Sequence, residues 1–132
     1  MTSRPLALVI DDDPLMLEFV STALEGGGFE VETAEDAQRL LADVQDRHPA
    51  IVFLDVRMPG ETGIEVLRRL RVSDWGREVP VVIMTGERRL DRVVEAMSAG
   101  ATTYMMKPFT PVQIVLRARE LIQPRESGSF HY

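Results

Sequence analysis

The sequence predicts a single α/β domain built around a parallel β-sheet. Five short apolar runs alternate along the chain with five segments whose apolar residues recur at helical spacing. Strands and helices that alternate in this way form a parallel sheet with right-handed crossovers and with helices on both faces. The length of 132 residues suits one domain, and no internal repeat, low-complexity tract or interior linker divides the chain.

The first three elements are a strand, a helix and an edge strand. Residues 6–10 are all apolar, as expected for a parallel strand that is covered on both faces. Residues 29–33 alternate between polar and apolar, which predicts an edge strand with one wet face. The helix between them should end at the three glycines 26–28, because its regularly spaced apolar residues stop there: Met16, Phe19, Val20, Ala23 and Leu24.

The middle of the chain holds the second helix, the third strand and the third helix. Residues 51–54 form the third strand and lead directly into Asp55. The pattern Thr-x-x-Glu at 62–65 is a capping box, which predicts a helix from there through about Arg71. The second helix precedes Pro49 and is marked by Ala37, Leu40, Leu41 and Val44.

The last two strands and helices follow in the same alternation. Residues 79–84 form the fourth strand, residues 103–106 the fifth, and residues 111–122 the last helix, with a proline in its first turn. The fourth helix should stop at Gly100 and is marked by Leu90, Val93, Val94 and Met97. Four methionines are predicted to fill the core: Met84, Met97, Met105 and Met106.

Composition narrows the function classes. The net charge of −6 argues against direct nucleic-acid binding by this domain, because phosphate contacts need clustered cations. The absence of cysteine excludes disulfides, thiolate metal sites and cysteine nucleophiles. The apolar runs are too short to span a membrane and no signal-peptide pattern opens the chain, so we expect a cytoplasmic protein. The domain should cover residues 1–123, with 124–132 as a short polar tail or the start of a linker.

Chemically capable side chains collect at the ends of four predicted strands. In open α/β sheets, ligands bind at the carboxyl ends of the strands, near the point where the strand order reverses. Converging carboxylates repel one another, and a hard divalent cation such as Mg²⁺, bound by oxygen ligands, relieves that repulsion. The side chains are Asp11, Asp12 and Asp13 after the first strand, Asp55 after the third, Thr85 after the fourth, and Lys107 after the fifth.

The run of three aspartates also has a purely structural explanation. Negative charge is stabilised at a helix N-terminus, so these residues could simply cap the first helix. One aspartate is enough for that purpose, and Asp13, directly before Pro14, is the natural cap. Capping therefore leaves Asp11 and Asp12 unexplained.

Lys107 is the single lysine among fifteen basic residues. Arginine does not replace lysine where a compact point charge is needed, although chance survival explains one lysine equally well until its neighbours are considered. Pro108 restricts the backbone of Lys107 and permits the rare cis peptide bond. Thr85 by itself is as readily a β-branched strand end. Opposite a carboxylate and a metal, however, an ammonium and a hydroxyl suit a transferring phosphoryl group.

Taken together, four stretches resemble the receiver domain of bacterial two-component response regulators. The likeness covers about residues 6–122, with the motifs in the family's order and at the right element ends. It implies a flavodoxin-like (βα)5 fold, a doubly wound parallel five-stranded sheet of order 2-1-3-4-5. In motif wording it is most similar to nitrogen-fixation-type regulators. The stretches are Val9-Ile10-Asp11-Asp12-Asp13-Pro14, Leu54-Asp55-Val56-Arg57-Met58-Pro59-Gly60 with Gly63, Val82-Ile83-Met84-Thr85-Gly86, and Gly100-Ala101 through Tyr104 to Lys107-Pro108-Phe109.

The resemblance implies a phosphoacceptor and a metal site. Asp55 would take a phosphoryl group from a phosphohistidine of a sensor histidine kinase or phosphotransfer protein. Mg²⁺ would be held by Asp11, Asp12, Asp55 and the main-chain carbonyl of Arg57. Asp13 aligns with a variable position and is not expected to be a ligand.

The resemblance also implies a switch. Lys107 and Thr85 would contact the phosphoryl oxygens, and Lys107 would bind Asp55 directly in the resting state. Tyr104 would be the aromatic side chain whose rotamer reports switching. The output surface would comprise the fourth helix, fifth strand and fifth helix, through which a phosphorylation-dependent homodimer is expected. The domain would be a signalling switch rather than an enzyme, catalysing only its own phosphorylation and dephosphorylation.

Two other functions share parts of this pattern. An aspartate-nucleophile phosphatase of the haloacid-dehalogenase type needs a second aspartate two residues after the nucleophile, where this chain has Arg57, and a cap domain. A flavodoxin-like cofactor module needs a first loop rich in Ser and Thr. The acidic run at 11–13 would instead repel a flavin phosphate.

Overall fold

The computed structural model describes residues 4–56, 62–86 and 90–122. Within these ranges the strands form one parallel sheet in the order β2-β1-β3-β4-β5. This confirms the fold class and the strand order that the resemblance implied. The strands are β1 (Leu6–Ile10), β2 (Glu30–Ala34), β3 (Ile51–Asp55), β4 (Val81–Thr85) and β5 (Thr103–Met106).

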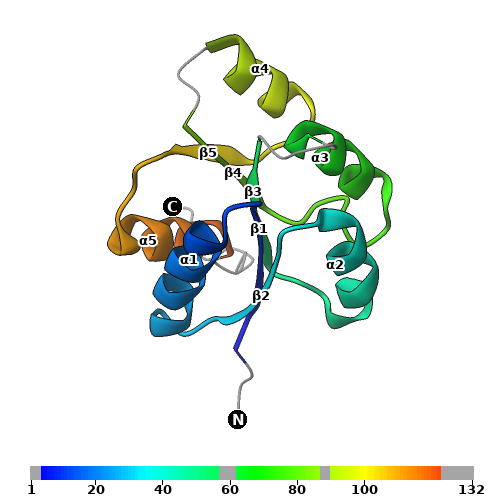
Figure 1. The fold of residues 1–132 in the computed structure, drawn as a ribbon. Coiled ribbons are helices and arrows are strands. Elements are labelled where there is room, and N and C mark those ends of the chain that lie inside the picture. The colour runs from blue at the N-terminus through cyan, green and yellow to red at the C-terminus, as the bar shows by residue number, and fades with distance from the viewer. Residues whose placement is uncertain (1–3, 57–61, 87–89, 123–132) are drawn as a thin grey trace, which may run out of the picture.

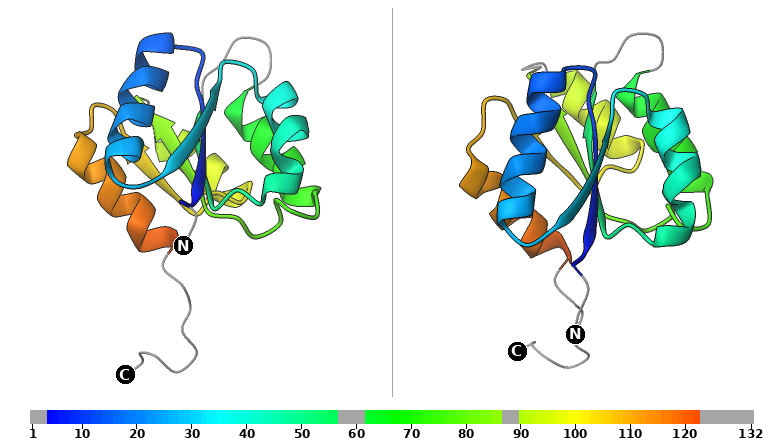
Figure 2. Two further views of the ribbon diagram at one scale, coloured as in Figure 1. Left: turned by 90° about the horizontal axis from the view of Figure 1, so that it is seen from below. Right: turned by 60° about the horizontal axis from the view of Figure 1, so that its bottom comes forward.

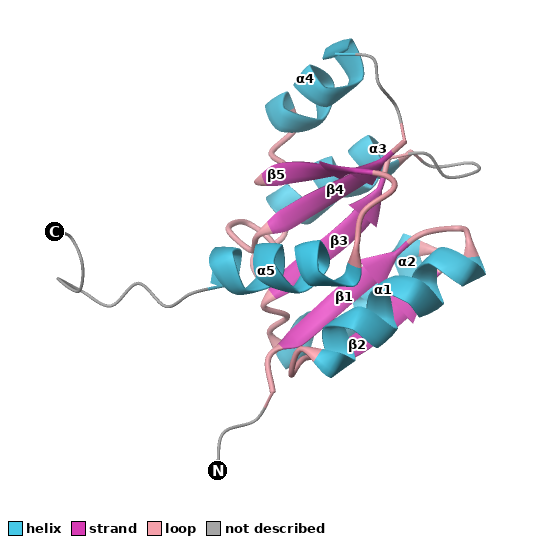
Figure 3. Cartoon of the chain, turned by 90° about the vertical axis from the view of Figure 1, so that its left-hand side faces the viewer, coloured by secondary structure: helices cyan, strands magenta, loops and turns pink. Residues whose placement is uncertain are grey.

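Helices cover both faces of the sheet. In Figures 1 and 2, α1 and α5 lie on one face and α2 and α3 on the other. Figure 3 shows α4 beyond the β4–β5 end of the sheet. No described helix has the length and apolar character that crossing a membrane requires. The helices are α1 (Pro14–Gly26), α2 (Ala37–Val44), the short 3-10 helix η1 (Gln45–Arg47), α3 (Gly63–Val72), α4 (Leu90–Ser98) and α5 (Pro111–Ile122).

The element boundaries follow the sequence pattern closely, with one informative difference. β4 begins at Val81, two residues later than predicted. Pro80 has no N–H group to donate to the ladder, so it precedes the strand and contributes only its carbonyl, which accepts from the N–H of Val52 at 2.9 Å. The predicted capping box is present: Thr62 caps α3 and exchanges hydrogen bonds with Glu65.

The core consists of two apolar layers, one on each side of the sheet. Every residue of β1, β3 and β4 is buried, as the continuous apolar runs predicted for strands that are covered on both faces. Alternate residues of each strand point to opposite layers. Leu8 and Val52, for example, pack toward α2 and α3, whereas Val9 and Phe53 pack toward α1 and α5.

Helix α4 is held to the core more loosely than the other helices. Among its described side chains only Ala96 is buried, while Val94 and Met97 are more than a third exposed. The prediction that Met97 fills the core is therefore wrong. The helical spacing does predict α4, but among the described side chains the helix buries only a narrow face. Met84 and Met105 are buried as predicted.

The C-terminal end of α4 is fixed by an arginine from another helix. Gly100 ends α4 with a φ of 114°, a left-handed conformation that suits glycine. Arg71 of α3 donates from Nε to the Gly100 carbonyl at 2.9 Å. Its Nη1 donates to the carbonyls of Gly76 at 2.9 Å and Val79 at 2.6 Å. Burial lowers the pKa of Arg71, and the three carbonyls offset part of that desolvation.

Arg71→Ala should lower the free energy of unfolding by about 2 kcal/mol, because hydrogen bonds from a charged donor to three half-buried carbonyls are lost. Urea denaturation monitored by circular dichroism measures this change. Arg68→Ala is the matched control, since Arg68 is an exposed arginine on the same helix, and its loss should change stability by less than about 0.5 kcal/mol. Equal effects of the two substitutions would contradict a structural role for Arg71.

Candidate functional site

Four strands deliver polar side chains to one rim of the sheet. Asp11 follows the last residue of β1, Asp55 ends β3 and Thr85 ends β4. Lys107 directly follows β5 and donates its backbone N–H to the carbonyl of Thr85 at 2.7 Å. Because all the strands are parallel, their carboxyl ends share one rim, and the structure brings these residues together as the sequence predicted.

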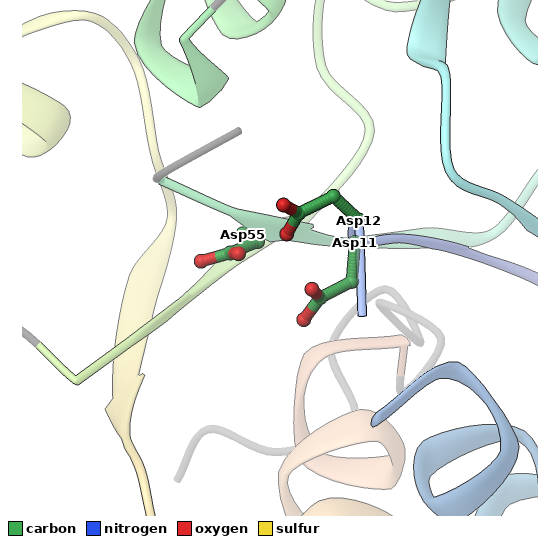
Figure 4. A group of neighbouring side chains, drawn as sticks. All are labelled: Asp11, Asp12 and Asp55. Carbon is green, nitrogen blue, oxygen red and sulfur yellow. The ribbon is translucent and has the colours of Figure 1, made fainter. Parts of the chain in front are cut away.

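Three carboxylates converge on this rim. One oxygen from each of Asp11, Asp12 and Asp55 lies within 4.8 Å of the others. Figure 4 shows Asp11 and Asp12 reaching in from the end of β1 and Asp55 from the end of β3. Asp11 is fully buried and Asp55 is 6 % exposed, whereas Asp12 is the most accessible of the three. The burial of two of the three acids makes their mutual repulsion more costly than it would be in open solvent.

The ammonium group of Lys107 faces the two buried acids. Its Nζ donates to Asp11 Oδ2 at 3.2 Å and lies 3.7 Å from Asp55 Oδ1. The expected contact with Asp55 is thus present as an ion pair, while the hydrogen bond goes to Asp11. The Lys107–Pro108 peptide bond is cis, the form that the sequence permitted.

Asp13 has a different role from its two neighbours. Its side chain accepts a hydrogen bond from the N–H of Leu15 at 3.0 Å and caps α1, as predicted. Its own N–H donates to Asp11 Oδ1 at 3.0 Å, which holds the Asp11 carboxylate in place. The structure therefore separates one capping aspartate from two aspartates that point into the rim.

Two predicted switch residues flank the rim. Thr85 is 3 % exposed at the end of β4, beside Met106 of β5. Tyr104 of β5 is 40 % exposed, so its ring has access to solvent. The remaining predicted ligand, the main-chain carbonyl of Arg57, lies outside the described residues.

The chemistry of the donor set fits a divalent cation. Carboxylate oxygens are the hard ligands that Mg²⁺ prefers, and it commonly binds through a small number of protein carboxylates together with waters and a phosphate. Three acids gathered within 4.8 Å also create the negative potential that such a cation would neutralise. The residues present are therefore suited to Mg²⁺.

Gly63, which the sequence indicated only as part of a motif, lies directly against the end of β3. Gly63 is the first residue of α3, and its N–H donates to the carbonyl of Val56 at 2.8 Å, next to Asp55. The available signal was a glycine directly after a helix N-cap, where the helix itself gains nothing from glycine.

Comparison with known proteins agrees with this geometry. The family model for the response regulator receiver domain matches residues 7–119. The DNA-binding response regulator MtrA of Mycolicibacterium smegmatis is 38% identical over 125 residues, which are 95% of this chain and 54% of that protein. The phosphate regulon transcriptional regulatory protein PhoB of Pseudomonas aeruginosa is 33% identical over 121 residues, 92% of this chain and 53% of that protein. The chain thus spans about half the length of these curated relatives.

Solved structures show the same likeness. The chemotaxis response regulator CheY4 of Vibrio cholerae superposes with a TM-score of 0.81 at 30% identity, covering 91% of this chain and 99% of that one. The receiver domain of NtrX from Brucella abortus superposes with a TM-score of 0.80 at 32% identity, covering 88% of this chain and 97% of that one.

The division of labour among the aspartates has a measurable consequence for the metal-free protein. Asp12→Ala should leave the free energy of unfolding unchanged or raise it, because it removes one of three repelling charges. Asp13→Ala should lower it by about 1 kcal/mol, because the helix cap is lost. Urea titrations without divalent cations compare the pair. A loss of several kcal/mol in Asp12→Ala would mean that Asp12 is itself a structural cap.

Proposed function

The chain belongs to the response regulator receiver domain family, and from that premise we propose that its rim accepts a phosphoryl group on Asp55. The observation that carries the proposal is the placement of Asp55. Its carboxylate is nearly buried at the end of β3, 3.7 Å from the ammonium of Lys107 and beside two further acids. Such a carboxylate is held in one place, which is what an attacking nucleophile requires.

Asp11, Asp12 and Asp55, together with the main-chain carbonyl of Arg57, would hold Mg²⁺. When bound, Mg²⁺ supplies positive charge that offsets the approach of a phosphoryl group to the acidic rim. The donor in this proposal is the phosphohistidine of a sensor histidine kinase or phosphotransfer protein.

In the transfer step an oxygen of the Asp55 carboxylate attacks phosphorus in line with the phosphorus–nitrogen bond of the phosphohistidine. The new oxygen–phosphorus bond forms as the phosphorus–nitrogen bond breaks, and the leaving imidazole keeps the electron pair. Lys107 then donates to one phosphoryl oxygen, and the hydroxyl of Thr85 donates to another. The burial of Asp55 and Thr85 limits the access of water to the acyl phosphate.

Phosphorylation of Asp55 would be transmitted through Thr85 to Tyr104. The acyl phosphate adds roughly −1.5 to −2 units of charge, which draws the Thr85 hydroxyl toward it and leaves space for the Tyr104 ring to turn inward. Inverting a mostly inactive population needs roughly 5.5 kcal/mol of differential interaction, and charge-assisted hydrogen bonds at a desolvated rim are strong enough to supply it.

The surface formed by α4, β5 and α5 would carry this output, including a phosphorylation-dependent homodimer. It bears a set of large apolar side chains that are at least 40 % exposed: Val94, Met97, Tyr104, Val112 and Leu116. Tyr104 belongs to this set, so a change in its rotamer alters the surface itself. Exposed large apolar side chains are typical of interaction sites where they form a contiguous patch.

Neither alternative function is supported by the comparisons. Arg57 stands where the phosphatase would need its acid–base aspartate, and the first loop is acidic where a flavodoxin-like module would bind phosphate. We propose a cytoplasmic switch that catalyses only its own phosphorylation and dephosphorylation and does not itself contact DNA or membranes. MtrA is named as a DNA-binding protein, and that activity is attributed to MtrA alone.

Asp55→Asn should abolish phosphorylation by acetyl phosphate and Mg²⁺, because the amide is not a nucleophile. Intact-mass spectrometry of the wild-type chain should show the mass of one added phosphate. Asp13→Asn is the matched control, since asparagine keeps the helix cap and phosphorylation should persist. Labelling of Asp55→Asn at the wild-type rate would move the acceptor to another residue.

Lys107→Arg should not rescue function, although it keeps the charge. The planar guanidinium is wider than the ammonium, which must reach Asp11 and Asp55 from one point. We expect slow phosphate uptake and a failure to reposition Thr85 and Tyr104. The measurement is the chemical-shift change at Tyr104 on adding beryllofluoride, a mimic of the bound phosphoryl group. Changes as large as in the wild type would show that the lone lysine is an accident of composition.

A further inference from the structure

The first residue of α3 is in direct backbone contact with the strand that carries Asp55. An ideal Cβ built on Gly63 would lie 2.1 Å from the carbonyl oxygen of Asp55, 2.8 Å from the Cα of Val56 and 2.9 Å from the carbonyl carbon of Asp55. Real Cβ atoms are essentially never found within 3.0 Å of such atoms. All three neighbours are backbone atoms, so no flexible side chain can move aside.

Space, and not backbone conformation, is the reason for glycine at this position. The positive-φ glycines in the described residues are Gly28 and Gly100, so the backbone of Gly63 is one that alanine also adopts. Alanine is in fact the better helix former. A glycine here therefore serves the contact between α3 and β3 and not the helix.

If a methyl group were added at Gly63, the helix and the strand would have to separate by about 1 Å. The helix is the better fixed of the two. Its first turns are held by the Thr62 capping box and by the buried side chains of Ile64 and Leu67. Asp55 is the last residue of its strand, and the next ladder bond, from the N–H of Val56 to the carbonyl of Met84, is long at 3.3 Å. The displacement should therefore fall on Asp55.

We propose that Gly63 is a positioning residue for Asp55: the bare backbone at the start of α3 sets how far the end of β3 reaches into the rim. The contacts that this position controls are short. Asp55 Oδ1 lies 3.7 Å from Lys107 Nζ, and the three carboxylates gather within 4.8 Å. A displacement of about 1 Å is large on that scale, and errors of that size cost a reacting group up to roughly 100-fold in rate. The proposal rests on Asp55 being the phosphoacceptor.

The test compares Gly63→Ala with the wild-type chain of 132 residues. Phosphorylation by acetyl phosphate at saturating Mg²⁺ should be about 10- to 100-fold slower in the variant. Without metal or phosphate, the backbone amide chemical shifts of Asp55 and Val56 should change, and those of β1 should not. The chemical shifts are independent of activity, and they report whether β3 or α3 moves to accommodate the added methyl group.

Two other glycines provide matched controls. Gly76→Ala is equally crowded, because its Cβ would lie 2.3 Å and 2.4 Å from atoms of Leu70, far along the chain from the rim. It should lose stability and keep the wild-type phosphorylation rate at a temperature where it is folded. Gly26→Ala places the same methyl group where it meets no neighbouring segment within 4 Å, and it should keep the wild-type phosphorylation rate without losing stability.

Each outcome separates the hypotheses. A wild-type chain that is not phosphorylated on Asp55 refutes the proposed function itself. A wild-type rate in Gly63→Ala, with shift changes confined to α3, shows that the helix yields and overturns the positioning role. An equal slowing in Gly76→Ala assigns the effect to lost stability and also overturns it.

If Gly63→Ala does not fold, Thr62→Ala replaces it. That variant adds no atoms but removes the cap that holds the first turn of α3. Because the turn would then fray, phosphorylation should slow several-fold; an unchanged rate would overturn the proposal.

Discussion

The crowding of negative charge at one rim of the sheet is the constraint on which the rest of this structure depends. Parallel strands bring Asp11 and Asp55 together with Asp12, and two of these acids are almost completely buried. The ammonium of Lys107 faces both buried acids, and the N–H of Asp13 fixes the Asp11 carboxylate. Positive charge from Lys107, together with a divalent cation where one is bound, would offset the repulsion among these acids. The apolar layers on both sides of the sheet supply the rigidity that keeps the acids in place despite their repulsion.

The surroundings of the rim are unequally rigid. On one side the backbone of Gly63 packs directly on Asp55, so the start of α3 and the end of β3 are in close contact. On the other side α4 buries Ala96 among its described side chains, and Arg71 fixes its C-terminal end through the Gly100 carbonyl. A rim that packs against α3 next to a loosely held α4 would suit a switch, because a local change in charge at the rim could then move the surface around α4.

The family relationship and the site support each other at different levels. The match over residues 7–119 establishes the receiver domain. The short distances from Lys107 to Asp11 and Asp55 show that the rim side chains of this chain also lie close together. The curated relatives are about twice as long as this chain. Activities that depend on the rest of their length are therefore properties of those relatives. For this chain, the exposed apolar side chains of α4, β5 and α5 are where an output would act.

The sequence by itself determined the elements, their order and most of the rim. Apolar periodicity is a local property, so residues such as Thr103–Met106 and Pro111–Ile122 could be assigned without knowing their neighbours. The rim residues could be found because each one lies at or just after the end of a strand. Only the tertiary structure decided that Lys107 hydrogen-bonds to Asp11, that Gly63 touches the Asp55 backbone, and that Met97 lies exposed. Each of these depends on how separate helices and strands pack against one another, and no local sequence pattern sets that packing.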